Sequence, residues 1–474
     1  MTIEALYQEF LKSSGICTDT RKVVKDTLFV ALKGEHFDGS QFVETALREG
    51  CRLAITENSA LSGNPRVRVV PSALGTLQQL AHHHRMQLAP RVLAITGSNG
   101  KTTTKELIHA VLSSTYSVLS TRGNLNNHIG VPLTLLSLKG EEIAVVEMGA
   151  NHRGEIAALC GIAAPEVGLI TNVGKAHLEG FGSLEGVLDA KGELYAYLAD
   201  KGGSAIVDGN DSMLLEKARQ TGVTSLVAGA GGEIPLTCRL IRQSPHLEVE
   251  IEASGETHSV RTGLVGAYNM QNILLAAATG IHFGVPLTQI ARAISRYAPN
   301  NSRSQFMEGK RNRLILDSYN ANPTSMRESV GGMLEYAEPP IMLILGEMAE
   351  LGRTSEEEHR ALMDWITSLM ADPKAQADPK AQADPKAQAV QKAQADQNAR
   401  GTQKPKVDRV LLIGATFFDL YRREAAGQPW PDGMVAFRER KELEAQLRAE
   451  TPKGYHILVK GSRVNELEKI VPLL

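Results

Sequence analysis

The stretch Ile95-Thr-Gly-Ser-Asn-Gly-Lys-Thr-Thr-Thr-Lys105 decides the expected fold, because it places a glycine-rich turn between an apolar strand and a helix. Residues 91–96 are predicted to form a short buried strand, and residues 101–112 carry apolar side chains at helical spacing. The turn therefore opens onto a helix N-terminus, whose unpaired N–H groups favour a phosphate. It departs from the strict phosphate-loop pattern, because Ile95 stands where that pattern has a glycine. A Gly-Lys-Thr in an ordinary surface turn is the alternative interpretation.

We expect this turn to bind the phosphates of ATP. Lys101 would lie against the β and γ phosphates, and the Thr102 hydroxyl would be a ligand of Mg²⁺. The residues expected to contact the nucleotide in this segment are Gly97, Ser98, Asn99, Gly100, Lys101, Thr102 and Thr103.

The composition is that of an ordinary globular chain. With 474 residues, two or three domains are expected, and the formal net charge of −2 argues against nucleic-acid binding. We find no export signal and no apolar run of membrane-spanning length, so we expect a cytoplasmic monomer without membrane insertion. Four widely spaced cysteines fit reduced thiols better than disulfides or zinc ligands: Cys17, Cys51, Cys160 and Cys238.

Apolar strands alternate with helical stretches along most of the chain. Such strands are typical of parallel sheets covered by helices on both faces. We predict an α/β fold of three domains: a small unit at 1–88, a mostly parallel phosphate-loop sheet at 89–298, and a second doubly wound, Rossmann-like sheet at 299–474. The predicted strands are residues 27–31, 53–56, 91–96, 143–148, 167–171, 205–208, 314–317, 341–346, 410–413 and 457–460, with a small β excursion at 236–240 and 247–252.

A low-complexity segment interrupts the third domain. The hexapeptide Ala-Asp-Pro-Lys-Ala-Gln occurs three times between Ala371 and Gln388, and degenerate copies continue beyond it. Regular prolines and the lack of large apolar side chains predict a disordered insert at 371–403. A partner-binding arm is the functional alternative.

Polar side chains gather where the predicted strands end, which is where an open α/β sheet places its ligands. Glu147 ends an apolar strand and would suit a magnesium ligand, although a surface glutamate is the alternative. His177 follows the next strand, and it could be either a metal ligand or a structural histidine. Lys191 on the following helix resembles, by itself, any solvated lysine.

Two further clusters belong to this set. Asn269 and Asn272 begin a predicted helix and face the same way, so they could read an adenine edge, or Asn269 could cap the helix. The segment Asp317-Ser-Tyr-Asn-Ala-Asn-Pro323 follows a strand and precedes a helix. Its polar density indicates a ligand site or an elaborate N-terminal cap.

The chain resembles the Mur ligases, the ATP-dependent amide-forming family of peptidoglycan assembly, over nearly its whole length except the repeat insert. Four segments carry the resemblance: Thr96–Thr104, Glu147–His152, Ala176–Ser183 and Asp317–Asn322. Within that family, residues 177–183 and 346–352 are most similar to the branch that adds D-alanyl-D-alanine to UDP-N-acetylmuramoyl tripeptide.

The resemblance implies a role for each matching residue. Glu147 and His177 would hold Mg²⁺ with Thr102, and Lys191 would be a carbamylated lysine beside the metal. Lys101, Lys191, His177 and Arg303 would form the catalytic group. Further nucleotide contacts would come from Asn269, Asn272, Arg303, Asp317, Tyr319 and Asn320. The substrate contacts would be Thr18, Asp19, Thr20 and Arg21 for the uridine diphosphate, with Asn124, Asn126, Asn127 and Lys460 nearer the reaction centre.

The implied reaction is transfer of the γ-phosphoryl group to a peptide carboxylate, followed by attack of the dipeptide amine on the acyl phosphate. No residue stands out as the base for that amine. Two alternatives remain open: a folylpolyglutamate-type ligase, and a non-catalytic ATP-binding module. The separate first domain argues against the former, because its Cys17–Arg21 segment resembles a nucleotide-sugar site that such enzymes do not need.

Overall fold

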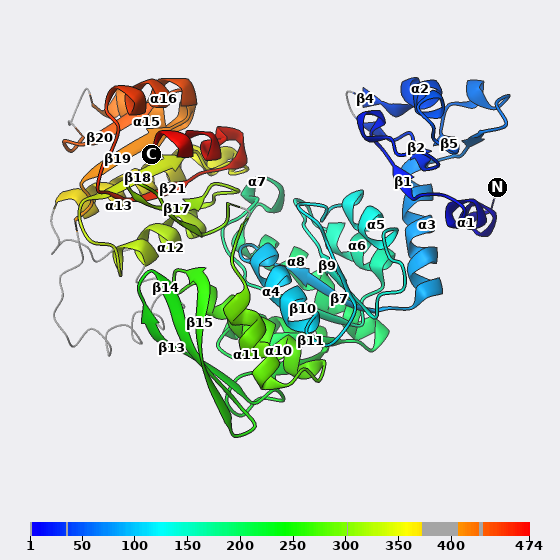
Figure 1. Ribbon diagram of the computed structural model, residues 1–474, viewed down its shortest axis with the longest axis horizontal. Helices are drawn as coiled ribbons and strands as arrows, with labels where there is room; N and C mark the ends of the chain where they lie inside the picture. The colour runs from blue at the N-terminus through cyan, green and yellow to red at the C-terminus, as the bar shows by residue number, and fades with distance from the viewer. Residues whose placement is uncertain (1, 35–36, 301, 372–405, 426–429) are drawn as a thin grey trace.

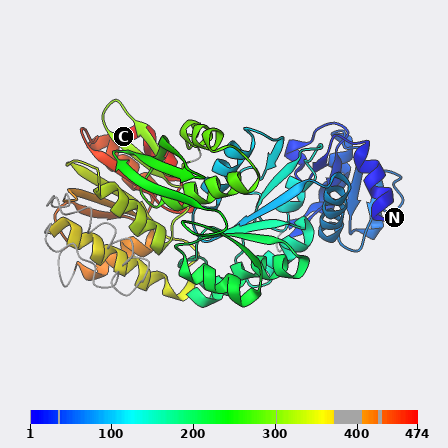
Figure 2. The ribbon, with the colours of Figure 1, turned by 90° about the horizontal axis from the view of Figure 1, so that it is seen from below.

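The computed structural model describes residues 2–34, 37–300, 302–371, 406–425 and 430–474. Three α/β units follow one another along the chain (Figure 1), and the first and third lie at opposite ends of a row (Figure 2). The predicted fold class, α/β with mostly parallel sheets, is confirmed. The predicted insert at 371–403 lies, from residue 372 onward, outside the described residues.

The first unit contains a four-stranded parallel sheet in the order β1-β2-β5-β6. The strands are β1 (Ile16–Cys17), β2 (Leu28–Val30), β5 (Leu53–Thr56) and β6 (Val67–Val69), with a small hairpin of β3 (Lys33–Gly34) and β4 (Phe37–Asp38). Its helices are α1 (Ile3–Leu11), α2 (Val43–Arg48) and α3 (Ala73–Leu88). The strand predicted at 53–56 is found as predicted, and the one at 27–31 is shorter.

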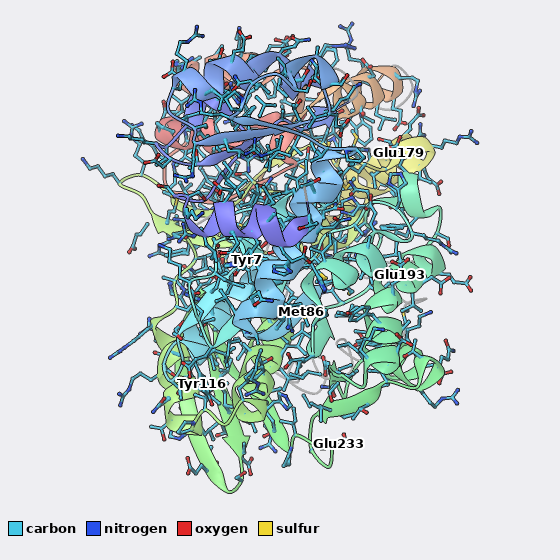
Figure 3. The ribbon with its side chains drawn as sticks, turned by 90° about the vertical axis from the view of Figure 1, so that its right-hand side faces the viewer. Tyr7, Met86, Tyr116, Glu179, Glu193 and Glu233 are labelled. Atoms are coloured by element: carbon cyan, nitrogen blue, oxygen red, sulfur yellow. The ribbon has the colours of Figure 1, made fainter. Side chains whose placement is uncertain are left out.

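Helix α3 joins the first unit to the middle unit. The Arg85 guanidinium donates hydrogen bonds to the Ala163 carbonyl at 3.0 Å and to the Ala164 carbonyl at 2.8 Å. The buried His84 ring contacts the Tyr7 hydroxyl at 3.1 Å and the Leu138 carbonyl at 3.0 Å. Figure 3 looks onto this side of the molecule, with Tyr7 of α1 labelled. Buried polar contacts therefore fix α3 to its neighbours on both sides.

The middle unit is built on a six-stranded, all-parallel sheet in the order β12-β11-β10-β7-β9-β8. Its strands are β7 (Arg91–Thr96), β8 (Val118–Ser120), β9 (Ile143–Glu147), β10 (Val167–Ile170), β11 (Ser204–Asp208) and β12 (Thr224–Ala228). Its helices are α4 (Lys101–Leu112), α5 (Gly130–Leu135), α6 (Glu155–Ala163), α7 (Leu178–Phe181), α8 (Leu184–Lys201), α9 (Ser212–Thr221), α10 (Asn269–His282) and α11 (Leu287–Arg296).

Alternation along β7 explains how both faces of this sheet become core. Val92 and Ala94 pack against α3, α5, α6 and α8, whereas Leu93 and Ile95 pack against α4, α10 and α11. The chain leaves β7 toward β8 and β9 on one side and later crosses to β10 on the other. The carboxyl ends of β7 and β10 therefore form a topological switch point, where α/β sheets bind ligands.

The predicted β excursion is larger than expected. It is a three-stranded antiparallel sheet of β13 (Leu236–Gln243), β14 (His246–Ala253) and β15 (Glu256–Val265), which projects at the lower edge of Figure 1. The prediction missed β15, because its alternating exposed and buried residues lack a continuous apolar run. One face of this sheet packs on α10 and α11.

The third unit has a six-stranded sheet in the order β16-β17-β21-β18-β19-β20, in which only β16 runs antiparallel to its neighbour. The strands are β16 (Gln305–Glu308), β17 (Arg313–Asp317), β18 (Ile341–Gly346), β19 (Arg409–Ile413), β20 (Met434–Phe437) and β21 (His456–Lys460). The α-helices around it are α12 (Pro323–Leu334), α13 (Ser355–Ala371), α15 (Ala415–Glu424) and α16 (Arg440–Ala449). Short 3₁₀ segments are η4 (Gly352–Thr354), η7 (Arg463–Asn465) and η8 (Leu467–Leu473).

Candidate active site

A cavity of about 1560 Å³ lies between the middle and third units and collects most of the predicted site residues. Its walls come from the carboxyl ends of parallel strands in both sheets, as the topology requires. Predicted residues that line it are Ser98, Asn99, Gly100, Lys101, Thr102, Thr103, Asn124, Asn126, Asn127, Glu147, His177, Asn269, Asn272, Arg303, Asp317, Tyr319, Asn320 and Lys460. Predicted residues that do not line it are Gly97, Lys191, Thr18, Asp19, Thr20 and Arg21.

The turn between β7 and α4 is packed so tightly that two of its residues must be glycine. Gly97 has a φ of +147°, and a Cβ there would overlap the Thr171 hydroxyl. A Cβ on Gly100, at φ +78°, would likewise overlap the Asn272 side chain. Both positions therefore need a residue without a side chain. Their backbone is pressed against β10 and α10 beside the cavity.

Lys101 bends back over this turn. Its Nζ donates to the Gly97 carbonyl at 2.6 Å and to the Ser98 carbonyl at 3.1 Å. Burial lowers the pKa of Lys101, and Glu147 partly opposes that effect. The turn is also tied to the segment after β10, because the Ser98 N–H donates to the Asn172 carbonyl at 2.9 Å. The helix N-terminus, the lysine and the turn thus form a pre-organised anion site.

Glu147 ends β9 with its side chain almost fully buried. Oε2 accepts a hydrogen bond from the Thr102 hydroxyl at 3.0 Å and lies 3.9 Å from the Lys105 Nζ. Oε1 accepts one from the Asn126 amide at 2.8 Å. The carboxylate is therefore held at the helix N-terminus by two residues of α4 and by Asn126 in the loop before α5.

These donors fit a magnesium ion that is held partly by the protein and partly by the phosphates of a substrate. The Glu147 and Thr102 oxygens converge at the cavity wall, and hard oxygen donors suit Mg²⁺. Among the described residues, no three His, Cys, Asp or Glu side chains are grouped closely enough to hold a metal by themselves. Mg²⁺ commonly keeps several waters and takes one or two protein ligands together with substrate phosphates.

His177 and Lys175 carry contacts from the middle unit to the third. The His177 Nδ1 lies 2.7 Å from the Glu350 Oε2, and Lys175 pairs with Glu358 at 2.6 Å. The contact with His177 lowers the pKa of Glu350, with a smaller contribution from Lys101. His177 has a left-handed backbone, at φ +52°, where it precedes α7. The structure therefore places it against the third unit.

Lys191 is not a solvated lysine. It lies on α8 with 1% of its surface exposed, and its Nζ is 5.8 Å from the Phe181 ring. Within the described part of the chain, no carboxylate or hydrogen-bond acceptor pairs with that amine. Desolvation lowers its pKa well below the ordinary value, and the nearby charge of Lys101 adds to the effect. A buried amine without a counter-charge is costly as a cation and favours its neutral form.

Asn269 and Asn272 face one another at the start of α10, as the spacing predicts. The Asn272 amide donates to the Asn269 Oδ1 at 2.7 Å, and the Asn269 amide donates to the Val265 carbonyl at 2.8 Å. The Asn272 Oδ1 accepts a hydrogen bond from Thr104. The alternative that Asn269 caps the helix is not observed, because the cap residue is Tyr268 and it makes no side-chain cap bond.

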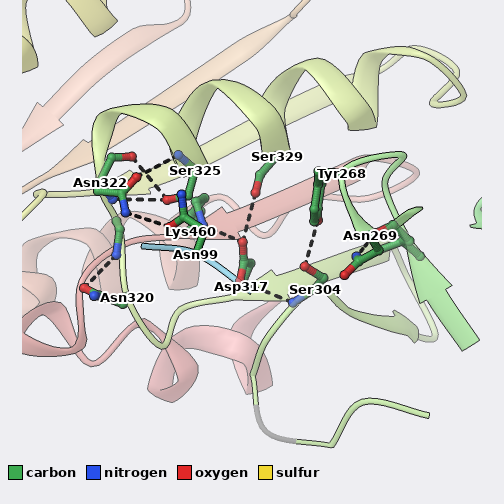
Figure 4. A network of polar contacts seen from close by, with 12 residues as sticks. Asn99, Tyr268, Asn269, Ser304, Asp317, Asn320, Asn322, Ser325, Ser329 and Lys460 are labelled. Carbon is green, nitrogen blue, oxygen red and sulfur yellow. Dashed lines mark hydrogen bonds and ion pairs between the residues drawn. The ribbon is translucent and has the colours of Figure 1, made fainter. Parts of the chain in front are cut away.

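A polar network from the third unit faces the phosphate turn (Figure 4). The Asp317 carboxylate pairs with Lys460 and accepts hydrogen bonds from the Ser329 hydroxyl at 2.9 Å and the Ser304 N–H at 3.3 Å. The Ser304 hydroxyl meets the Tyr268 hydroxyl of the middle unit at 2.7 Å. Asp317 and Lys460 therefore form an ion pair at the cavity wall, in which Lys460 is buried and Asp317 is partly buried, rather than two free charges.

Asn322 both caps a helix and takes part in the cavity site, which are the two roles predicted for its segment. It caps α12 through a capping box with Ser325, and its amide donates to the Asn99 Oδ1 of the phosphate turn at 2.7 Å. Sequence reasoning missed its reach across the units, and it also missed Lys105, Asn172 and Glu350. Lys105 follows Lys101 by one helical turn, which was a usable signal. The others depend on contacts between distant segments.

Fold and site together define a phosphate-loop protein that binds a nucleotide between two α/β units. Family models match three successive parts of the chain: Mur ligase family, catalytic domain, at residues 12–85; Mur ligase middle domain at 95–280; and Mur ligase, glutamate ligase domain, at 302–463. The chain belongs to the Mur ligase family.

Similar proteins extend over almost the whole chain. UDP-N-acetylmuramoyl-tripeptide–D-alanyl-D-alanine ligase of Bacillus subtilis is 33% identical, over 96% of this chain and 92% of the relative. The Escherichia coli ligase of the same name is 34% identical, over 97% of this chain and 93% of the relative. A crystal structure of MurF from Acinetobacter baumannii, 30% identical, superposes with a TM-score of 0.78 over 99% of this chain and 98% of that one. MurF ligase of Thermotoga maritima in complex with ADP is 27% identical, with a TM-score of 0.76 over 98% and 97%.

The comparisons favour one branch of the family over the folylpolyglutamate alternative. Folylpolyglutamate synthase of Mycobacterium tuberculosis has a TM-score of 0.58 at 12% identity, which shows a shared fold alone. None of the described helices combines the length and the apolar character needed to cross a bilayer. All four cysteines are free, as predicted.

Proposed function

We propose that this protein is the ATP-dependent ligase that adds D-alanyl-D-alanine to UDP-N-acetylmuramoyl tripeptide in peptidoglycan synthesis. One observation carries the proposal: a phosphate turn in the middle unit faces the Asp317 and Asn322 network of the third unit across one cavity. The relatives that match the whole length of the chain carry this activity in their names. The non-catalytic alternative gives no reason for a buried carboxylate and a buried amine of lowered pKa near that turn.

The reaction joins two steps. The tripeptide carboxylate attacks the γ-phosphorus of ATP, the bond to the β-phosphate oxygen breaks, and an acyl phosphate and ADP result. The neutral dipeptide amine then attacks the acyl carbon, the carbon–oxygen bond to phosphate breaks, phosphate leaves with the electron pair, and the new amide nitrogen loses a proton. Carboxylate and triphosphate repel one another, so cations must converge where they meet. Lys101 and Arg303 line the cavity and supply that charge.

We propose the remaining site roles on the same basis. Thr102, Glu147 and His177 would hold Mg²⁺, which supplies charge neutralisation for the transferring phosphoryl group. Lys191, as a carbamate, would present an anionic oxygen pair toward the metal site, and its buried neutral amine is the form that reacts with carbon dioxide. Asn124, Asn126 and Asn127, which line the cavity, would contact the incoming substrate. Asn269, Asn272, Tyr319 and Asn320 would contact the nucleotide.

The first unit would bind the uridine diphosphate through Thr18, Asp19, Thr20 and Arg21. Arg21 forms an exposed two-point pair with Asp19, and this pair lowers the pKa of Asp19 to about 2. An exposed guanidinium of this kind can exchange its carboxylate for a diphosphate. We further propose domains at 1–88, 89–298 and 299–474, a monomer in the cytoplasm, and a role in cell shape and division through the cell wall.

A phosphate-release assay tests the proposal. With purified protein, ATP, Mg²⁺ and UDP-N-acetylmuramoyl tripeptide, we expect phosphate release only when D-alanyl-D-alanine is added. Lys101→Ala abolishes the release without unfolding the protein, and chelation of the metal abolishes it reversibly. Release supported by glutamate with a folate substrate, or release independent of the dipeptide, would contradict the assignment.

A further inference from the structure

Two arginines meet at one aromatic ring beside the cavity. The Arg303 Cζ lies 3.7 Å from the centroid of the Tyr319 ring, and the Arg463 Cζ lies 5.4 Å from the same centroid. Arg303 and Tyr319 line the cavity, whereas Arg463 is exposed at the start of η7 and is not among the lining residues. The ring of Tyr319 thus contacts one cation inside the cavity and a second cation outside the cavity wall.

Both guanidinium groups lack a counter-charge. Within the described part of the chain, neither the Arg303 nor the Arg463 guanidinium group forms an ion pair or a hydrogen bond. The carboxylate of this neighbourhood, Asp317, is already paired with Lys460. An aromatic face attracts a cation but does not neutralise it. Two like charges that share one ring therefore leave excess positive charge, which an anion would compensate.

The backbone at both arginines is constrained. Arg303 lies between Ser302 at φ +57° and Ser304 at φ +47°, two left-handed residues other than glycine. Such backbone costs free energy and persists where the surrounding structure enforces it.

The turn that carries Arg463 is fixed by hydrogen bonds. The Ser462 N–H donates to the Glu347 carbonyl at 3.1 Å, and its hydroxyl donates to the Asn465 Oδ1 at 3.0 Å. The Arg463 backbone is therefore anchored to the end of β18, and only the side chain has freedom.

We propose that Arg463 binds the C-terminal carboxylate of the incoming dipeptide, while Arg303 serves the phosphates on the other side of Tyr319. This inference rests on the proposed function. A guanidinium fork matches a carboxylate with two parallel hydrogen bonds. An extended dipeptide spans about 7 Å between its amine and its carboxylate. That length suits a ligand that extends between two guanidinium groups held against one aromatic ring. The arrangement would point the amine inward to the acyl phosphate.

The test compares two substrates that differ only in charge. D-alanyl-D-alanine carries the carboxylate, and D-alanyl-D-alanine amide lacks it. We expect Arg463→Gln to raise the KM for D-alanyl-D-alanine by about tenfold or more, with the KM for ATP unchanged. We expect the amide to be a poor substrate for the natural enzyme and the preference for the acid over the amide to collapse in the variant. Arg463→Lys keeps the positive charge but loses the forked guanidinium group. We expect its KM for D-alanyl-D-alanine to lie between those of the natural enzyme and Arg463→Gln.

Arg422 offers a matched control. It is also an exposed arginine stacked on an aromatic ring, with its Cζ 5.9 Å from the Phe418 centroid, but Phe418, unlike Tyr319, does not line the cavity. Arg422→Gln should leave the kinetic constants for both substrates unchanged. Unaltered thermal melting of Arg463→Gln would show that its effect is not unfolding.

Each contrary result has a distinct meaning. A raised KM for ATP with an unchanged KM for the dipeptide would overturn the inference and assign Arg463 to a phosphate. An acid-to-amide preference that survives in Arg463→Gln would overturn it too. If the natural enzyme releases no phosphate in response to D-alanyl-D-alanine, the proposed function itself fails, and the inference fails with it.

Discussion

Gly97 has no room for a side chain, and its position shows how a single residue shapes the nucleotide site. The Thr171 hydroxyl fills the space that a Cβ would need, and the same hydroxyl donates to the Asn99 carbonyl at 2.6 Å. A side chain at Gly97 would therefore displace the bond that holds the turn against β10.

Gly97→Ala is expected to weaken nucleotide binding. The overlap with Thr171 and the unfavourable φ cost about 1–3 kcal/mol, which distorts the turn that must receive the phosphates. Titration with a fluorescent ATP analogue measures the loss, expected at about tenfold. Gly161→Ala is the control, because nothing lies within 4 Å of a Cβ at that position in α6. Equal affinity of Gly97→Ala and the natural protein would show that the turn adjusts freely.

Lys191 is the residue whose environment differs most from what its neighbours in sequence suggest. Its burial makes a neutral amine or a derivatised amine the favoured form. A carbamate carries negative charge and so suits a position near Lys101 and the proposed metal site.

Lys191→Ala is expected to lose most activity and to regain part of it with bicarbonate or a short carboxylate. In the natural protein, ¹³C-labelled bicarbonate should give a carbamate carbon resonance in the NMR spectrum, which Lys191→Ala should lack. Lys217→Ala, on α9 and paired with Asp189, is the control for a lysine nearby. Full activity of Lys191→Ala, or the same resonance in that variant, would rule the carbamate out.

At the scale of elements, α12 connects helix capping with contact between units. Asn322 and Ser325 each supply half of the capping box, but only Asn322 also reaches Asn99 of the phosphate turn. The start of one helix in the third unit is thereby coupled to the start of another in the middle unit.

Asn322→Ala and Ser325→Ala should cost similar stability, about 1 kcal/mol each for a lost cap. Only Asn322→Ala should also raise the KM for ATP, because it removes the hydrogen bond to Asn99. Thermal melting and steady-state kinetics separate the two effects. An equal rise of KM in both variants would assign the effect to capping alone.

At the scale of the whole molecule, scattered polar contacts hold the third unit over the cavity. Besides the Asn322–Asn99 and Tyr268–Ser304 hydrogen bonds, these include the ion pairs Lys175–Glu358 and His177–Glu350 and a hydrogen bond from Gln243 to the Gly332 carbonyl at 2.7 Å. Because partly exposed pairs contribute little individually, we expect the third unit to move relative to the middle unit and to close on the substrates.

Glu350→Gln combined with Glu358→Gln is expected to shift the unliganded protein toward more open forms. Small-angle X-ray scattering should show a larger radius of gyration without nucleotide, and an ATP analogue should reverse most of the change. A control pair, Glu356→Gln with Glu450→Gln, removes ion pairs that lie within the third unit. No difference in scattering between the two double variants would show that these contacts do not govern closure.

The sequence by itself determined the local elements of this protein. Apolar runs located β7, β9, β10 and β18 to within a residue at each end, and the glycine turn predicted the start of α4 beside the cavity, because these features depend on neighbours along the chain. Only the tertiary structure decided that Lys191 is buried, that Glu350 meets His177, and that Arg303 and Arg463 share the ring of Tyr319. Burial and charge pairing depend on which distant segments the sheets bring together. The number of residues between two such segments does not indicate how close they lie in the folded protein.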